Sequence, residues 1–166
     1  MNVSVGILLF VAWAAVVAIS DCRSRRISNL VVATGLAAAF GCAFLQCGPF
    51  GVPLTQAGIG ALIGFVALLP FFAIGVMGAA DVKVFAVMGA WCGMHALLGL
   101  WMAASLAAGV HALWLLITTR TRLAGLIRSP GATFQLAGKS STPYAACLAV
   151  AASAWLVLQG LPGGLR

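Results

Sequence analysis

Apolar residues follow one another along this chain in runs long enough to cross a lipid bilayer. A membrane-spanning helix needs roughly 18–20 predominantly apolar residues, and several stretches approach or exceed that length. The helices expected from these runs cover residues 3–20, 30–45, 57–77, 82–92, 97–117 and 144–158. The pattern therefore predicts an all-α, polytopic membrane protein with about six transmembrane helices.

The stretch from Val82 to Thr118 is the hardest to divide. It carries no charge except Lys83, and it is too long for one span and short for two. We expect a short helix ending near Cys92, a turn at Gly93–His95 and a longer helix from Leu97 to Ile117. A five-helix arrangement also fits this part of the pattern.

The composition excludes a soluble domain. Hydrophobic residues make up 63% of the 166 residues and charged residues only 7%, whereas about a quarter of a typical soluble chain is charged. No internal repeat or linker is evident, so residues 1–166 are expected to form a single integral-membrane domain. Pairs of glycines in G-x-x-x-G spacing, Gly60/Gly64 and Gly89/Gly93, predict close packing between helices.

The net charge of +7 is carried by clusters between the apolar runs rather than by one polar face. The main clusters are Arg23, Arg25 and Arg26, and then Arg120, Arg122, Arg128 and Lys139. Such clusters mark the cytoplasmic side of a membrane and bind anionic lipid headgroups. We therefore expect both termini outside, residues 47–55 as an external turn, residues 120–139 as the largest cytoplasmic loop, and no nucleic-acid partner.

Only two acidic residues, Asp21 and Asp81, occur in the chain. The predicted topology places Asp21 at the end of the first helix and Asp81 between the third and fourth, at the same membrane face. Acidic residues at or in a membrane are costly and tend to mark functional sites. A structural explanation also exists, because Asp21 could pair with Arg25 and Asp81 could cap the helix that begins at Val82.

Two neighbouring carboxyl groups share a proton and titrate as a pair. Such a pair can supply a base that activates water and an acid that protonates a leaving amine, which is the equipment of an aspartic protease. No competing nucleophile motif or zinc-ligand spacing appears, so no metal or other cofactor is expected. Cys47 and Cys92 fall on the external side, which permits a disulfide without arguing for one. His95 and His111 are assigned no catalytic role.

The segments around the two acids resemble the type IV prepilin peptidases, bacterial relatives of the GxGD aspartyl membrane proteases. The first family motif, an aspartate followed by basic residues and Ile-Pro-Asn, stands here as DCRSRRISN at 21–29. The second, Gly-x-Gly-Asp-Val/Phe-Lys before a Gly-Ala-Trp segment, stands as GAADVK at 78–83 with GAW at 89–91. Pro143-Tyr144-Ala145 also resembles the opening of the family's last helix. Ser28 replaces the usual proline, and this change is expected to loosen the turn there. Ala80 replaces the glycine before Asp81. Alanine is tolerated at that position unless the backbone needs a positive φ, which glycine adopts more easily.

The resemblance implies an aspartic endopeptidase of the bacterial inner membrane, a multi-pass protein with Asp21 and Asp81 as its catalytic pair. Its substrates would be prepilins and pseudopilins, which have a short basic leader before a hydrophobic helix, cut at the cytoplasmic membrane face. Gly78, Lys83 and Asn29 would shape the loop or meet the substrate, with Lys83 orienting Asp81 or, by preference, holding a lipid headgroup. No C-x-x-C insert is present, as in the compact, peptidase-only branch associated with tight-adherence (Flp) pili.

Two other functions fit part of the pattern. A small transporter could use the acids to bind a proton or cation, although such proteins are expected to show an internal repeat and a site at the membrane midplane. A non-catalytic pilus assembly factor could retain the peptidase fold, with Ala80 as its only support. No prediction of the oligomeric state follows from the sequence.

Overall fold

The computed structural model describes residues 2–24, 27–75, 77–126 and 144–160 of the protein. Within these ranges every regular element is a helix. In chain order the helices are α1 (Asn2–Ser24), α2 (Asn29–Phe44), α3 (Leu54–Ala73), α4 (Ala79–Cys92), α5 (Met94–Leu126) and α6 (Tyr144–Gly160). The all-α class predicted from the apolar runs is confirmed.

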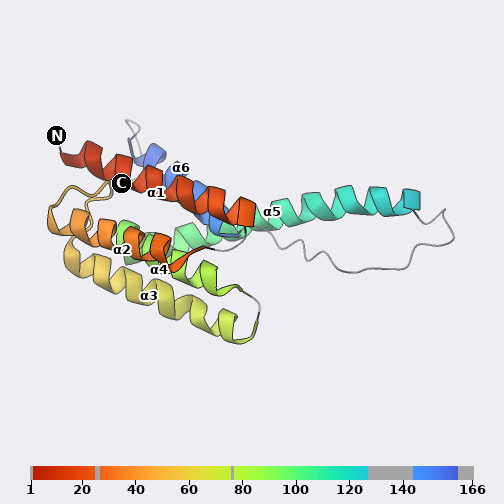
Figure 1. The fold of residues 1–166 in the computed structure, drawn as a ribbon, viewed down its shortest axis with the longest axis horizontal. Coiled ribbons are helices and arrows are strands. Elements are labelled where there is room, and N and C mark those ends of the chain that lie inside the picture. Colours follow the sequence, from red (N-terminus) through yellow and green to blue (C-terminus); the bar gives the residue numbers. More distant parts are fainter. Residues whose placement is uncertain (1, 25–26, 76, 127–143, 161–166) are drawn as a thin grey trace.

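The helices form a bundle whose connections define two ends (Figure 1). The α1–α2 and α3–α4 connections lie at one end, and the α2–α3 connection lies at the other. Helix α6 packs along α1, and α3 packs along α4. Asp21 is close to the end of α1 and Asp81 is close to the start of α4, so both belong to the same end of the bundle.

Helix α4 is the centre of the bundle. It contacts α2, α3, α5 and α6, and from Val82 to Cys92 every residue except Lys83 is buried. Its 14 residues extend about 21 Å at 1.5 Å per residue, less than the roughly 30 Å hydrocarbon core of a bilayer. The longer helices surround α4, which explains why its sequence is apolar on every side.

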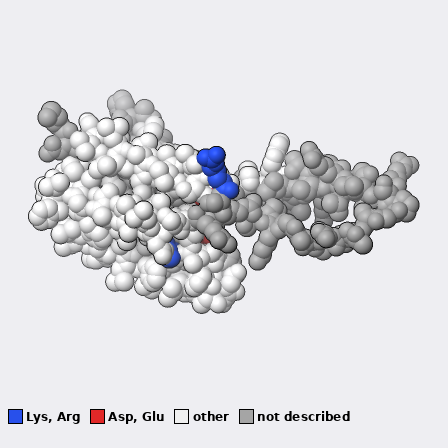
Figure 2. Space-filling model, viewed as in Figure 1, with Lys and Arg blue, Asp and Glu red and all other residues white. Residues whose placement is uncertain are grey.

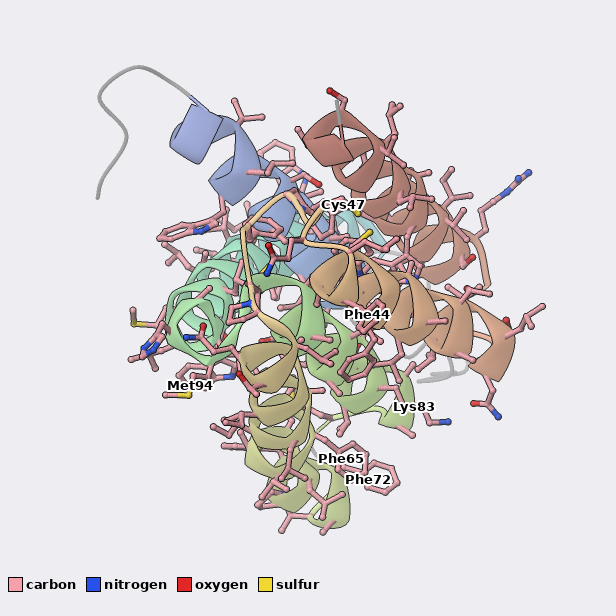
Figure 3. The ribbon with its side chains drawn as sticks, turned by 90° about the vertical axis from the view of Figure 1, so that its left-hand side faces the viewer. Phe44, Cys47, Phe65, Phe72, Lys83 and Met94 are labelled. Carbon is pink, nitrogen blue, oxygen red and sulfur yellow. The ribbon has the colours of Figure 1, made fainter. Side chains whose placement is uncertain are left out.

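The outward-facing surface is also apolar. Leu8, Leu62 and Leu106 are each about two-thirds exposed, and many other large aliphatic and aromatic side chains are exposed with them. The face in Figure 2 carries few charged atoms among the described residues, and Phe65 and Phe72 point away from the bundle in Figure 3. In the part of the chain that the structure describes, Ser4–Arg23, Leu54–Ala73 and Met94–Trp114 are long and apolar enough to cross a membrane, and α2 and α6 are shorter apolar helices. The protein is therefore a polytopic membrane protein.

Gly93 separates α4 from α5, which decides between the five-helix and six-helix patterns. Its φ of 75° lies in the left-handed region, which glycine adopts without the steric cost that a Cβ brings. The N–H of Gly93 donates to the carbonyl of Gly89 (2.9 Å) and closes α4, and α5 begins at the next residue. The predicted break at Gly93–His95 is confirmed, although it is a single residue wide.

Helix α5 is longer than the sequence analysis predicted. We expected it to end at Ile117 and the loop to begin by Arg120, but the helix continues through Leu126. Residues 118–124 contain no glycine or proline, and leucine and arginine favour helices, so the backbone continues beyond the apolar segment. Prediction of a loop over residues 120–126 was wrong, and the rest of that expected loop, residues 127–139, lies outside the described residues.

Glycines allow α3 and α4 to pack with their backbones in contact. A Cβ on Gly60 would overlap the carbonyl of Gly89, and one on Gly89 would overlap the carbonyl of Gly60. A Cβ on Gly64 would lie 2.8 Å from the carbonyl oxygen of Phe85. The close packing predicted from the G-x-x-x-G spacing is confirmed for these three residues, whereas Gly93 serves the turn.

Candidate active site

Asp21 lies in the last turn of α1, and its side chain points into the bundle. Its exposed fraction is 7%, and it is the only charged residue that is buried among the described residues. Its Oδ2 accepts a hydrogen bond from the backbone N–H of Ala146 in α6 (2.9 Å). A residue near the end of the first helix is thereby joined to the beginning of the last.

Asp81 is the third residue of α4 and stabilises the start of that helix. Gly78 is the N-cap residue, and its N–H donates to Oδ2 of Asp81 (3.2 Å). An acidic side chain in a first helical turn is favourable because it satisfies a free backbone donor and faces the positive end of the helix dipole. The capping role that the sequence allowed for Asp81 is therefore present, and its carboxylate also has a second donor.

That second donor is the backbone N–H of Ala145. The consecutive N–H groups of Ala145 and Ala146 thus donate to Asp81 and Asp21 respectively. The first N–H groups of a helix have no partner within the helix and attract anionic groups. The N-terminus of α6 consequently brings together two acids that come from α1 and α4.

The sequence does not predict the role of the α6 backbone, because every residue except proline has a backbone N–H and the residue type does not show where that group donates. The available signal in the sequence is the Pro143-Tyr144-Ala145 segment, which resembles the start of the family's last helix and so indicates a helix N-terminus there. Pro143 lies outside the described residues. The hydroxyl groups of Tyr144 and Ser105 are 3.3 Å apart, and this hydrogen bond holds the first residue of α6 against α5.

The electrostatic environment of Asp81 favours its protonated form. Asp81 lies outside the three candidate membrane spans, in the first turn of α4. Burial and then the charge of Asp21 raise the pKa of Asp81 from 3.8 to about 6, against the opposing effect of the N–H donors of Gly78 and Ala145. Asp21 is therefore close enough for its charge to act on Asp81, as the interaction of two neighbouring carboxyl groups requires.

Gly78, the N-cap of α4, and Ala80, within α4, both have a negative φ. Gly78 has φ −76° and ψ 149°, so no positive φ requires glycine there, but a Cβ would stand 3.2 Å from Oδ2 of Asp81. Ala80 is the second residue of α4 and has no positive φ. The backbone at Ala80 therefore accepts alanine without strain.

Lys83 and Asn29 contact one another. The ammonium group of Lys83 donates a 2.7 Å hydrogen bond to Oδ1 of Asn29, and this bond joins the fifth residue of α4 to the first residue of α2. The partner expected for Lys83 from the sequence is Asp81 or a lipid headgroup, whereas the structure pairs it with Asn29. The sequence does not predict this pairing, because 54 residues separate Lys83 from Asn29.

Ser28, the residue that replaces the family's proline, is the N-cap of α2. Its φ is −68° and its Oγ accepts a hydrogen bond from the N–H of Val31 (3.3 Å). A serine cap satisfies a free donor of the helix, and the looser turn expected at this position stays a prediction. The φ value would also suit proline, which explains how either residue can occupy this turn.

No metal site emerges from the residues that the structure describes. Among them, no group of three or more His, Cys, Asp and Glu side chains could hold a metal ion. Both histidines, His95 and His111, lie on α5 with exposed side chains.

Comparison with known families agrees with this arrangement of motifs. The family model described as "Type IV leader peptidase family" matches residues 8–113, which contain both Asp21 and Asp81. No curated protein and no solved structure matches the chain. Because the model covers more than half of the sequence, the chain belongs to the type IV leader peptidase family.

Proposed function

We propose that this protein is an aspartic endopeptidase that removes the short leader peptide from prepilins and prepilin-like proteins. Membership of the leader peptidase family makes it a protease. The observation that carries the catalytic assignment is the meeting of Asp21 and Asp81 at the N-terminus of α6. They are the only acids in the chain, and they occur in the two segments that resemble the family motifs.

The two carboxyl groups would divide the proton transfers of peptide hydrolysis. Burial and the charge of Asp21 raise the pKa of Asp81 to about 6, so Asp81 takes up a proton more readily than a free carboxyl group and would donate it toward the carbonyl oxygen of the scissile peptide bond. The carboxyl group of Asp21 would accept a proton from the attacking water. When the tetrahedral intermediate collapses, a carboxyl group of the pair protonates the leaving amine.

The surroundings of the pair support cleavage close to the cytoplasmic surface of the bacterial inner membrane. Arg23 is two residues beyond Asp21 and Lys83 is two residues beyond Asp81, and cationic residues beside apolar helices favour the cytoplasmic side. A prepilin with a basic leader before an apolar helix would present the boundary between the two at this level. The absence of a C-x-x-C insert from the sequence supports the peptidase-only branch associated with Flp pili.

An apolar groove between α1 and α6 supports a substrate with a hydrophobic helix. The groove has a volume of about 380 Å³ and is lined by Val11, Ala14, Ala15, Ala18, Ala149, Val150, Ser153, Ala154 and Val157. Its lining includes Ala18, one turn before Asp21, and Ala149, one turn after Ala146, so the groove extends toward the end of the bundle that holds the carboxyl pair. Small side chains allow a further helix to approach closely, and the proposed occupant is the apolar helix of the prepilin.

Co-expression with a candidate prepilin tests the function. Wild type should release a leader that ends at the leader–helix boundary, as read by gel mobility and N-terminal sequencing, whereas Asp21→Asn and Asp81→Asn should leave the precursor intact. Cys22→Ser is the matched control, because Cys22 is exposed and adjacent to Asp21, and it should cleave normally. Equal amounts of each variant in the membrane fraction must accompany the comparison.

Two results would overturn the assignment. Cleavage by either single aspartate variant would exclude the catalytic pair. Uncleaved precursor with wild type, across several candidate prepilins, would instead favour a proton-coupled transporter or a non-catalytic assembly factor.

A further inference from the structure

Helix α2 ends in a turn that brings two cysteines together. The N–H of Cys47 donates to the carbonyl of Cys42 (2.9 Å), and the N–H of Gln46 donates to the carbonyl of Ala43 (3.4 Å). Gln46 has a positive φ of 51°. These features define a Schellman motif, in which the side chains at the positions of Cys42 and Cys47 meet.

The two thiols are in contact. A hydrogen bond joins the side chains of Cys42 and Cys47, and both residues are buried. Disulfide-linked residues in proteins usually have Cα atoms about 4.4–6.8 Å apart, a separation that residues joined by this kind of tight turn can satisfy.

The cysteine pair lies far from the carboxyl pair in the fold. The α2–α3 connection, which contains Cys47, is at the end of the bundle opposite the α1–α2 and α3–α4 connections (Figure 1). Figure 3 views the bundle from that end and shows Cys47 beside α1 and α2. The positive residues beside Asp21 and Asp81 favour the cytoplasm for the other end, so the cysteine end would face the oxidising side of the membrane.

We propose that Cys42 and Cys47 form an intrachain disulfide that locks the C-terminal turn of α2. The oxidant would be a disulfide-bearing molecule of the extracytoplasmic space. The Cys47 thiolate attacks one sulfur of that disulfide and releases one thiol, and the Cys42 thiolate then attacks the Cys47 sulfur of the mixed disulfide and releases the second. The two cysteines together lose two electrons and two protons, and the oxidant disulfide is reduced to two thiols.

Both the timing and the effect of the bond follow from its position. Only four residues lie between the cysteines, so the pair can close while α2 folds and before neighbouring helices bury it. The backbone of Cys47 also packs against α1, because a Cβ on Gly6 would overlap the carbonyl of Cys47. A fixed turn at Cys47 therefore also fixes the surface on which the beginning of α1 packs.

Counting free thiols tests the proposal without reference to proteolysis. The full-length protein is refolded in detergent with oxidised glutathione and then denatured. Its free thiols are alkylated, and the number of alkyl labels is counted by mass spectrometry. The reduced chain should take up five labels, one for each cysteine, and the oxidised chain three, with a linked peptide containing Cys42 and Cys47 after digestion. Cys92→Ser is the matched control, since it removes another buried thiol, and it should still lose two labels on oxidation.

The variants at the pair itself complete the test. Cys42→Ser and Cys47→Ser should each keep all four remaining labels under the same oxidising conditions. Five labels on the oxidised wild type, or a linked peptide that joins Cys47 to Cys92, would overturn the proposal. Because every measurement is made on labelled peptides, an inactive protease would leave the result unaffected.

Discussion

The ammonium group of Lys83 donates a 2.7 Å hydrogen bond to Oδ1 of Asn29, and this bond ties the first turn of α2 to the first turn and a half of α4. Asp81 is two residues before Lys83, and Asn29 is the first residue of α2, the helix that follows the one carrying Asp21. The bond therefore bridges the two segments that carry the acids. The Lys83–Asn29 hydrogen bond restricts how far Asp81 can move relative to α2.

Replacing Lys83 with methionine, which keeps the length of the side chain, should lower kcat/KM for prepilin cleavage by about fivefold. That factor corresponds to about 1 kcal/mol, the typical net value of one hydrogen bond. Asn29→Leu should have a similar effect, and the double variant should lose no more than either single one, because both remove the same bond. Arg23→Gln is the control for charge, and independent, additive losses at Lys83 and Asn29 would contradict the prediction.

The dependence of cleavage on pH should follow the protonation of Asp81. Its pKa is raised to about 6 by burial and by Asp21, so the carboxyl group is protonated below pH 6 and ionised above it. If catalysis requires one proton on the Asp21–Asp81 pair, kcat/KM should fall as the pH rises through about 6, because the protonated fraction of Asp81 falls. The loss should approach about tenfold per pH unit. Initial rates on a leader-containing peptide between pH 5 and pH 8 would measure this, and a rate that rises over the same interval would be the contrary result.

The sequence predicted the helices and the position of the two acids at one end of the bundle, because both follow directly from the residue types along the chain. Apolar runs mark the helices, and Asp21 and Asp81 stand out in a chain with no other acid. The N–H donors of Ala145 and Ala146 and the Lys83–Asn29 bond were not predicted. Each depends on which helices become neighbours, and the helix surfaces here are too uniformly apolar to indicate a partner.

The end of α5 and the cysteine pair were missed for other reasons. The apolar pattern ends near Ile117, but a helix needs only favourable backbone propensity to continue, and α5 extends to Leu126. Cys42 was placed inside a helix and Cys47 in a loop, so their contact depended on the kind of turn between them. Gln46 forms that turn with a positive φ, and a glutamine in the sequence does not predict a positive φ.

The contact between α3 and α4 should be sensitive to a single methyl group. Gly60→Ala places a Cβ against the carbonyl of Gly89, and relieving that overlap requires the helices to move apart, at a cost of about 1–3 kcal/mol. Gly58→Ala is the matched control on the same helix, since nothing lies within 4 Å of its Cβ, and it should be neutral or stabilising. Thermal unfolding in detergent would compare them, and equal melting temperatures would argue against backbone contact at Gly60.

Filling the groove between α1 and α6 should weaken substrate binding. Ala15 lines the groove and is exposed, so Ala15→Phe occupies space proposed for the prepilin helix without entering the core. We expect KM to rise about tenfold, as for the loss of about 1.4 kcal/mol of binding, with a smaller change in kcat. Ala12→Phe makes the same substitution at an exposed site outside the groove, and if it raises KM equally, the groove is not the binding surface.

Restoring the family's glycine before Asp81 should not increase activity. Ala80 lies within the first turn of α4 and has no positive φ, so alanine already adopts the conformation that places Asp81. Ala80→Gly should leave kcat/KM within about twofold and lower the stability of the protein by about 0.5–1 kcal/mol, because glycine loses more backbone entropy in a helix. Cleavage assays and thermal unfolding of wild type and Ala80→Gly would measure both effects. A large gain in cleavage by Ala80→Gly would mean that the working enzyme needs a backbone conformation at residue 80 that alanine resists.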